Sequence, residues 1–204
     1  MPLQNRVDPL GEFCAVPARG LFFGNRGGRI HRDDRTLSRR RWTSRTWICC
    51  RLAFRGRHRA VWGNGYTELF FLDEPTALAA GHRPCFECRR ADALAFAAAW
   101  ARAHGLGAAP RAGEMDEVLH AQRLDGRAKR RHRADLDDLP DGAMVVLEAA
   151  PFALRGDAVL PWSFAGYGPV RLRPRGAAVD LLTPPAMVAV LAAGYRPQWH
   201  PSAG

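Results

Sequence analysis

The sequence predicts an α+β fold, in which a small mixed sheet with helices is followed by a small β-rich module that one helix closes. Three observations lead to this prediction. Residues 46–54 and 66–73 carry the apolar patterns of strands. Residues 88–105 carry apolar side chains at helical spacing, with a glycine at the end. After Pro140, short apolar segments alternate with turns until a helix over 183–194.

The chain of 204 residues has a hydrophobic fraction of 47%, which is enough for a core. We expect three parts: residues 1–108 with the first sheet, residues 109–135 with a helix and a basic linker, and residues 136–204 with the β-rich module. No apolar run reaches the roughly 20 residues of a membrane helix. The N-terminus also lacks the apolar core of a signal peptide. These features predict a soluble cytoplasmic protein without a membrane partner.

The basic residues of this chain are concentrated in two runs. The formal net charge is +10, from 30 basic and 20 acidic residues. Residues 19–59 hold thirteen arginines against two acids, and residues 126–133 add five basic residues without an acid. Two such runs are typical of a polyanion binder, whereas a single run would indicate only a solvated surface. The predicted nucleic-acid contacts are Arg26, Arg29, Arg39, Arg40, Arg41, Trp42, Arg45, Arg130 and Arg131.

The cysteines suggest a metal site. Cys85 and Cys88 form a C-x-x-C motif at the start of a predicted helix, where thiolates are favoured and can bind zinc. Cys49 and Cys50 precede them on the predicted strand and complete the expected set of four ligands. Adjacent side chains on a straight strand point to opposite faces, so both can bind one ion only if the strand bends. Otherwise one of the pair is a core cysteine, Cys50 above all, and His82, His58 or Cys14 takes its place.

The segment ALAAGHRPCFECRRAD, residues 77–92, resembles the end of the zinc module of Ada-type DNA repair proteins. The resemblance extends back to TWICCRLAF and so covers about residues 46–92. It implies a small α+β domain in which four cysteines hold zinc, and one of them accepts a methyl group from a DNA phosphotriester. Cys85 and Cys88 match the second ligand pair of that family. The first pair departs from the pattern, because the family separates these cysteines by three residues.

An enzymatic function is the alternative class. P-C-x-x-C is half of a zinc deaminase signature, but the chain lacks the H-x-E half, which excludes a nucleobase deaminase of the standard type. A metal-dependent nuclease or phosphodiesterase would use Asp73, Glu74, Asp116 and His120. Against this reading, Asp73 also fits a helix cap and Asp116 also fits the first turn of a helix. Cys49 beside Arg51 is a further candidate, as an activated nucleophile.

The sequence therefore favours a zinc-containing protein that binds nucleic acid, DNA in particular, with a role in DNA damage recognition or repair. The first alternative is the nuclease described above. The second is a structural zinc module whose basic face binds an acidic protein partner.

Overall fold

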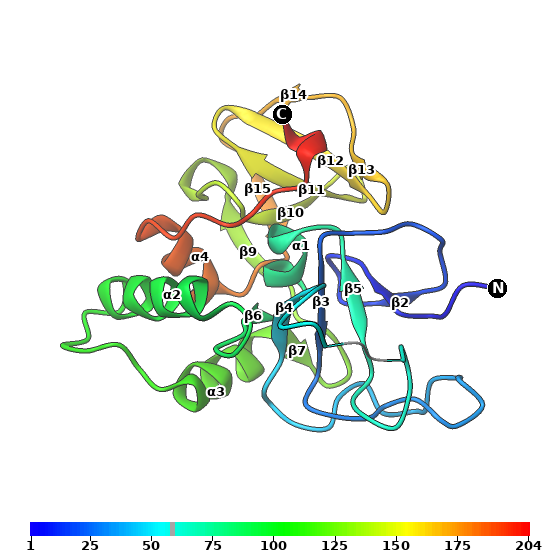
Figure 1. Ribbon diagram of the computed structural model, residues 1–204. Coiled ribbons are helices and arrows are strands. Elements are labelled where there is room, and N and C mark those ends of the chain that lie inside the picture. The colour runs from blue at the N-terminus through cyan, green and yellow to red at the C-terminus, as the bar shows by residue number, and fades with distance from the viewer. Residues whose placement is uncertain (58–59) are drawn as a thin grey trace.

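The computed structural model describes residues 1–57 and 60–204 (Figure 1). Its two main sheets and four α-helices confirm the predicted α+β fold. The first sheet lies in the N-terminal half and the second in the C-terminal half, and the helices lie beside and between them (Figure 1). In the described part of the chain, no helix combines the length and the apolar character needed to cross a membrane.

The first sheet has six strands in the order β2-β1-β5-β3-β4-β6. β1 pairs in parallel with β5, and β4 in parallel with β6, while the other pairs are antiparallel. The pairing of β4 with β6 matters most for the site, because it aligns the cysteines of the strand with the C-x-x-C segment. The strands are β1 (Arg6–Val7), β2 (Phe13–Cys14), β3 (Phe22–Asn25), β4 (Ile48–Arg51), β5 (Leu69–Phe71) and β6 (Arg83–Pro84).

The register of this sheet separates two faces. Phe23 on β3 lies opposite Cys50 on β4 and Phe70 on β5. In the neighbouring row of the sheet, Gly24 on β3 lies opposite Cys49 on β4 and Leu69 on β5. Cys49 and Leu69 have no exposed surface and belong to a core cluster. Because successive side chains of a strand point to opposite faces, Cys49 joins the core while Cys50 lies on the other face.

Four helices connect and cover the sheets: α1 (Glu74–Ala79), α2 (Arg90–Ala103), α3 (Ala112–Arg123) and α4 (Pro185–Ala192). Asp73 caps α1, as its position before Pro75 predicted, by accepting a hydrogen bond from the backbone N–H of Thr76. The last three helices share one apolar core, in which Trp100, Met115 and Val190 are buried.

The second sheet is antiparallel and has the strand order β13-β12-β11-β10-β15-β9, with β14 paired to β12. Its strands are β9 (His132–Asp135), β10 (Met144–Leu147), β11 (Ala150–Arg155), β12 (Ala158–Ser163), β13 (Gly166–Tyr167), β14 (Arg171–Leu172) and β15 (Ala178–Leu181). A separate hairpin joins β7 (Leu124–Asp125) to β8 (Ala128–Lys129). Two 3₁₀ turns cover Leu136–Asp138 and Pro201–Ala203.

The two halves of the chain pack against each other through an apolar cluster. Leu72 and Ala79 from the first half are buried with Met144, Leu160 and Leu182 from the second half. The N-terminal sheet that carries the cysteines is therefore built on the C-terminal module and shares a core with it.

Candidate metal centre and basic surface

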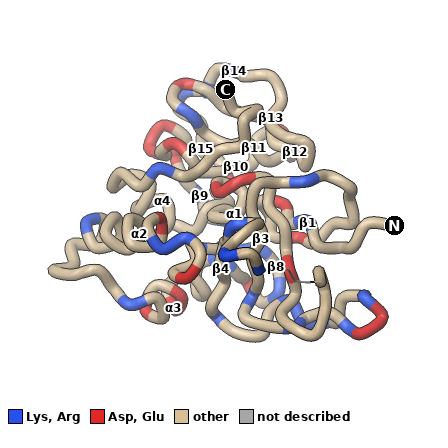
Figure 2. The backbone as a smooth tube through the Cα atoms, viewed as in Figure 1, with Lys and Arg blue, Asp and Glu red and all other residues tan. Residues whose placement is uncertain are grey.

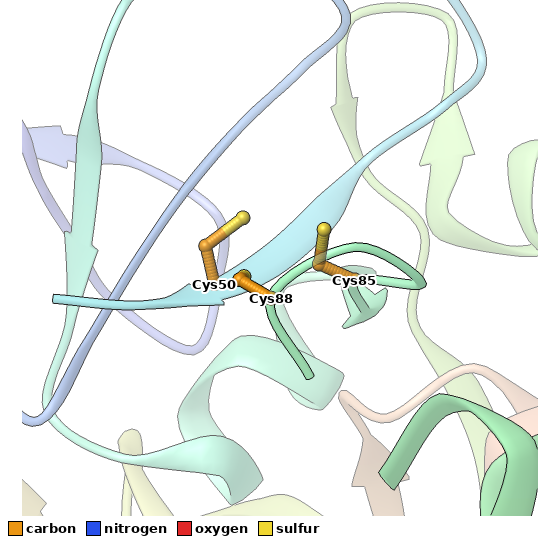
Figure 3. A group of neighbouring side chains, drawn as sticks. All are labelled: Cys50, Cys85 and Cys88. Atoms are coloured by element: carbon orange, nitrogen blue, oxygen red, sulfur yellow. The ribbon is translucent and has the colours of Figure 1, made fainter. Parts of the chain in front are cut away.

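Three cysteine side chains meet at the edge of the first sheet. Cys50 comes from β4, while Cys85 and Cys88 come from the loop between β6 and α2, and all three sulfurs lie within 4.8 Å of one another (Figure 3). Cys50 and Cys85 are buried and Cys88 is partly buried. The parallel pairing of β4 with β6 explains the approach, because it lets the Cys85 N–H donate a 3.0 Å hydrogen bond to the Cys49 carbonyl. The three thiols lie close enough to hold a metal ion.

The thiols share protons, which favours one thiolate. The thiols of Cys50 and Cys88 donate hydrogen bonds to Cys85, and this lowers the Cys85 pKa well below its ordinary value. The same sharing raises the pKa of Cys50, since its thiol is the donor and is also buried. A divalent cation would replace the shared protons, because metal ligation requires deprotonated thiols.

The fourth predicted ligand lies elsewhere. The Cys49 thiol is buried in the core and accepts a 3.4 Å hydrogen bond from the Arg89 guanidinium. Burial raises its pKa, which argues against the activated nucleophile considered above. Cys14 and His82 are also outside the three-sulfur cluster. His58 lies outside the described residues. β4 does not bring its adjacent cysteines to one site, and Cys50 alone joins the C-x-x-C pair. The core cysteine is therefore Cys49 and not Cys50, which is the reverse of the sequence-based expectation.

A cavity of about 260 Å³ opens beside the three cysteines, which form part of its wall. The aromatic residues Phe23, Phe54 and Phe70 line it, with Arg51 and Arg57 among the other wall residues. Glu68 contributes a buried carboxylate, which accepts a 2.8 Å hydrogen bond from the Trp62 N–H. Sequence analysis had not singled out Glu68, and only the sheet register brings it near the cysteines.

Asp73 and Glu74, which were predicted as catalytic residues, have no exposed surface and are fully engaged. Asp73 accepts hydrogen bonds from Thr76 and from the Tyr167 hydroxyl, at 3.0 and 2.8 Å. Glu74 forms a 2.8 Å ion pair with Arg89, whose side chain also has no exposed surface. These partners hold the two acids inside the protein and away from any substrate.

Asp116 and His120 share a face of α3, as predicted, but not a metal site. Both oxygens of the buried Asp116 accept hydrogen bonds from Arg83, at 2.9 and 2.8 Å. His120 accepts a hydrogen bond at Nδ1 from Arg123 and contacts the Trp42 ring edge-on. Burial and the nearby arginines lower the His120 pKa. Among the described residues, the three-cysteine group is the only cluster of potential ligands, so these acids do not converge on a cation.

The predicted nucleic-acid contacts divide into three kinds. Arg26 is buried, and Trp42 is partly buried with its ring 6.2 Å from that of Trp47. Several arginines, exposed or, in the case of Arg41, half-buried, are paired with acids. Arg39 and Arg40 are exposed. Figure 2 shows where the Lys and Arg positions, in blue, lie along the backbone. The paired arginines and their partners are Arg29 with Asp33, Arg41 with Glu12, Arg45 with Glu117, Arg130 with Asp125, and Arg131 with Asp180.

The two basic runs of the sequence meet in space. The Arg127 guanidinium donates a hydrogen bond to the Arg39 carbonyl, across 88 positions of sequence. Arg39, Arg40, Arg41 and Arg127 line a common surface cavity of about 220 Å³. We call these four residues the arginine surface. Sequence analysis named three of them, and Arg127 was missed because its run had no predicted neighbour.

Comparison with known proteins gives no relative. No family model matches the chain, and no curated protein or solved structure matches it.

Proposed function

We propose that this protein binds nucleic acid, and DNA in particular, through the arginine surface. The observation that carries the proposal is the meeting of two basic runs that are far apart in sequence. Polyanion binders need several cations on one surface, since phosphates contribute the larger part of nonspecific affinity. The resemblance of residues 46–92 to the Ada-type module extends the proposal to recognition or repair of damaged DNA.

Binding can be measured with fluorescent single-stranded DNA, duplex DNA and RNA over 50–200 mM salt. We expect log K to fall steeply with log salt, and the slope to decrease in the triple variant Arg39→Ala, Arg40→Ala, Arg127→Ala by roughly 0.7–0.9 per lost phosphate contact. A triple variant of exposed arginines elsewhere, Arg90→Ala, Arg175→Ala and Arg196→Ala, controls for net charge. An affinity for nucleic acid that does not change with salt contradicts the proposal. Binding of an acidic protein to this surface that nucleic acid does not displace also contradicts it.

We also propose that the metal is zinc. Three thiolates are a ligand set that zinc prefers, and Zn–S bonds of about 2.3 Å place the sulfurs of one tetrahedral site about 3.8 Å apart. The observed cluster needs only small shifts to reach that spacing. Cys50, Cys85 and Cys88 would hold the ion, which would tie β4 to the start of α2.

Metal content by mass spectrometry tests the zinc proposal. We expect about one zinc per chain, retained in Cys49→Ser and Cys14→Ser, and lost in Cys50→Ser and Cys85→Ser. A protein purified under reducing conditions without zinc, or one that loses zinc in Cys49→Ser, would contradict the assignment. The His58→Ala variant shows whether that histidine supplies a fourth ligand.

A second candidate function is a reaction at the metal, favoured by the aromatic cavity beside the cysteines. Its walls suit a planar ring, and two carboxylates line it, the buried Glu68 and Glu87, which pairs with Arg57. Of these, Glu68 is the candidate to move a proton there. Cobalt-substituted protein can test whether the cavity reaches the metal. We expect azide or imidazole to shift the visible cobalt bands, and a bulky Phe70→Trp variant to weaken that shift. A cobalt spectrum unaffected by either ligand would exclude access.

A further inference from the structure

Three basic side chains from distant parts of the chain gather around Trp47. Arg26 and Arg123 are 2% and 1% exposed, and Lys129 is partly buried beside them. The guanidinium carbons of Arg26 and Arg123 lie 4.0 and 3.8 Å from the centre of a Trp47 ring. We call Arg26, Arg123 and Lys129 the cation cluster.

In the described part of the chain, no acid forms a direct ion pair with these side chains, although Asp8, Glu12 and Asp116 act on them from a longer distance. Their hydrogen bonds go to neutral acceptors, which are mostly backbone carbonyls. Arg26 donates to Gly11, Arg123 donates to Gly81 and Arg45, and Lys129 donates to Ala79. Such bonds orient the side chains but leave their net charge in place.

Two polar atoms of this region have no partner at all. The Nε of Arg123 is buried and forms no hydrogen bond. Arg26 can only donate, so His82 accepts at Nε2, at 3.4 Å, and its neutral ring carries the proton on Nδ1. That Nδ1 is also buried and unpartnered. Unpaired buried donors are rare in native proteins and call for a ligand or another explanation.

The charges also oppose one another. Burial, followed by the charges of Arg26 and Arg123, lowers the Lys129 pKa to about 7. Burial lowers the Arg123 pKa to about 9. Taking a charge out of water without a counter-charge is costly, and a protein keeps such a group when something else offsets it. An anion at this position would offset all three.

The space for an anion is present. A cavity of about 10 Å³ lies among the cation cluster, Gly11, Arg41 and Arg127, which is room for one water-sized group. Arg41 and Arg127 also line the outer cavity of the arginine surface, so the two cavities are adjacent. A ligand can therefore place one atom in the inner cavity and the rest of its charged group in the outer cavity.

We propose that the cation cluster is an oxyanion site for one phosphate group, with one oxygen in the inner cavity and the others held by Arg41 and Arg127. The identity of that phosphate rests on the proposed function, which makes it a backbone phosphate of bound nucleic acid. Arg41 already pairs with Glu12, but a guanidinium has five donors and can serve both. The site would thus anchor one point of the nucleic acid below the arginine surface.

Inorganic phosphate is the first probe, titrated into the full chain with metal bound, at constant ionic strength and with chloride as the reference. Calorimetry and the thermal midpoint are the readouts. We expect saturable binding and a rise in midpoint that chloride does not give. Lys129→Met, which keeps the side-chain length without the charge, should weaken phosphate binding at least tenfold. Arg196→Met removes an exposed charge elsewhere and should leave it unchanged.

The variants also separate a ligand site from a structural one. If Lys129 served only to hold the fold, Lys129→Met would unfold more easily; an uncompensated charge predicts equal or greater stability without phosphate. Arg127→Met at the exposed mouth is a second variant that should weaken phosphate binding without disturbing the core. No response to phosphate in wild type, or the same response in Lys129→Met and Arg196→Met, overturns the proposal.

Competition with labelled DNA identifies the source of the phosphate. Displacement of DNA by phosphate, lost in Lys129→Met, supports a backbone phosphate. Phosphate binding that does not compete with DNA overturns the assignment to a backbone phosphate, while the proposed oxyanion site itself is supported. Phosphate binding in a protein that binds no nucleic acid refutes the proposed function alone.

Discussion

Two groups of buried charged side chains in this protein differ in their partners. Asp73 and Glu74 each accept hydrogen bonds from several donors. Glu74 accepts three, from Arg89, the Tyr195 hydroxyl and the Gln198 N–H, at 2.7–2.9 Å. The cation cluster has three charges and no acid. The first group, with Asp73, Glu74, Arg89, Tyr167 and Tyr195, is called the acid network below.

The contrast teaches that the partners of a buried charge indicate its role better than its type. The acid network was predicted as a catalytic site because two carboxylates follow a strand. Its carboxylates are saturated by groups from the far end of the chain, so it serves to join the two halves. The cation cluster lacks such saturation, which is why we assign it a ligand.

The largest expected effect comes from breaking the acid network. Arg89→Met keeps the bulk of the side chain over Phe22 but leaves Glu74 buried without a cation. We expect a loss of about 3–5 kcal/mol in the free energy of unfolding, measured with denaturant and with metal content verified. The adjacent exposed Arg90→Met should change stability by about 0.5 kcal/mol or less. Equal effects of the two variants would show that the network is not structural.

A smaller loss is expected from removing one hydroxyl of the network. Tyr167→Phe deletes the 2.8 Å hydrogen bond to Asp73 and keeps the ring in place. Hydrogen bonds to charged groups contribute about 1.5–3 kcal/mol, so we expect a loss in that range. Thermal unfolding with the double variant Tyr167→Phe, Asp73→Asn tests the pairing, since coupled residues give less than the sum of the single effects.

The smallest effect, and one of opposite sign, concerns the cation cluster. Without phosphate, Lys129→Met should gain about 1 kcal/mol at pH 6, because it removes a partly buried charge that has no ion-pair partner. A matching loss of stability in this variant would place Lys129 with the structural charges of the acid network.

The pH dependence sharpens the same contrast. The Lys129 pKa of about 7 lies below its ordinary value, mainly because of burial, with Arg26 and Arg123 also lowering it and Asp8 opposing them. Between about pH 7 and pH 10, the unfolded chain therefore holds a proton that the folded chain lacks, so this residue makes stability rise with pH. We expect the free energy of unfolding to rise less with pH in Lys129→Met than in wild type. It should also rise less in wild type when phosphate is bound. Denaturant unfolding at a series of pH values measures this dependence.

Local features could be predicted from the sequence. The Asp73 cap, the helix after Cys88 and the closeness of Cys85 to Cys88 all depend on neighbours a few residues apart. The choice between Cys49 and Cys50 was predicted the wrong way round, because it is set by the pairing of β4 with β6. The same limit applies to the unforeseen roles of Arg123 and Lys129.

Long-range partners account for the rest. The hydroxyl that binds Glu74 belongs to Tyr195, 121 positions further along the chain, and no periodicity connects the two. Arg26 and Arg123 come together only because both contact Trp47. A sequence pattern shows which side chains can be charged, whereas packing decides which of them find a counter-charge.

The acid network also limits how this protein can be dissected. A gene fragment that ends before residue 140 would keep all five cysteines and look like a minimal metal-binding piece. It would strip Asp73 of the Tyr167 hydroxyl, and Glu74 of Tyr195 and Gln198. The two acids would lose these partners. The apolar surface that the second sheet covers, which includes Leu72 and Ala79, would become exposed to solvent. Such a fragment is expected to aggregate on expression, and failure to recover it would say nothing about its affinity for metal.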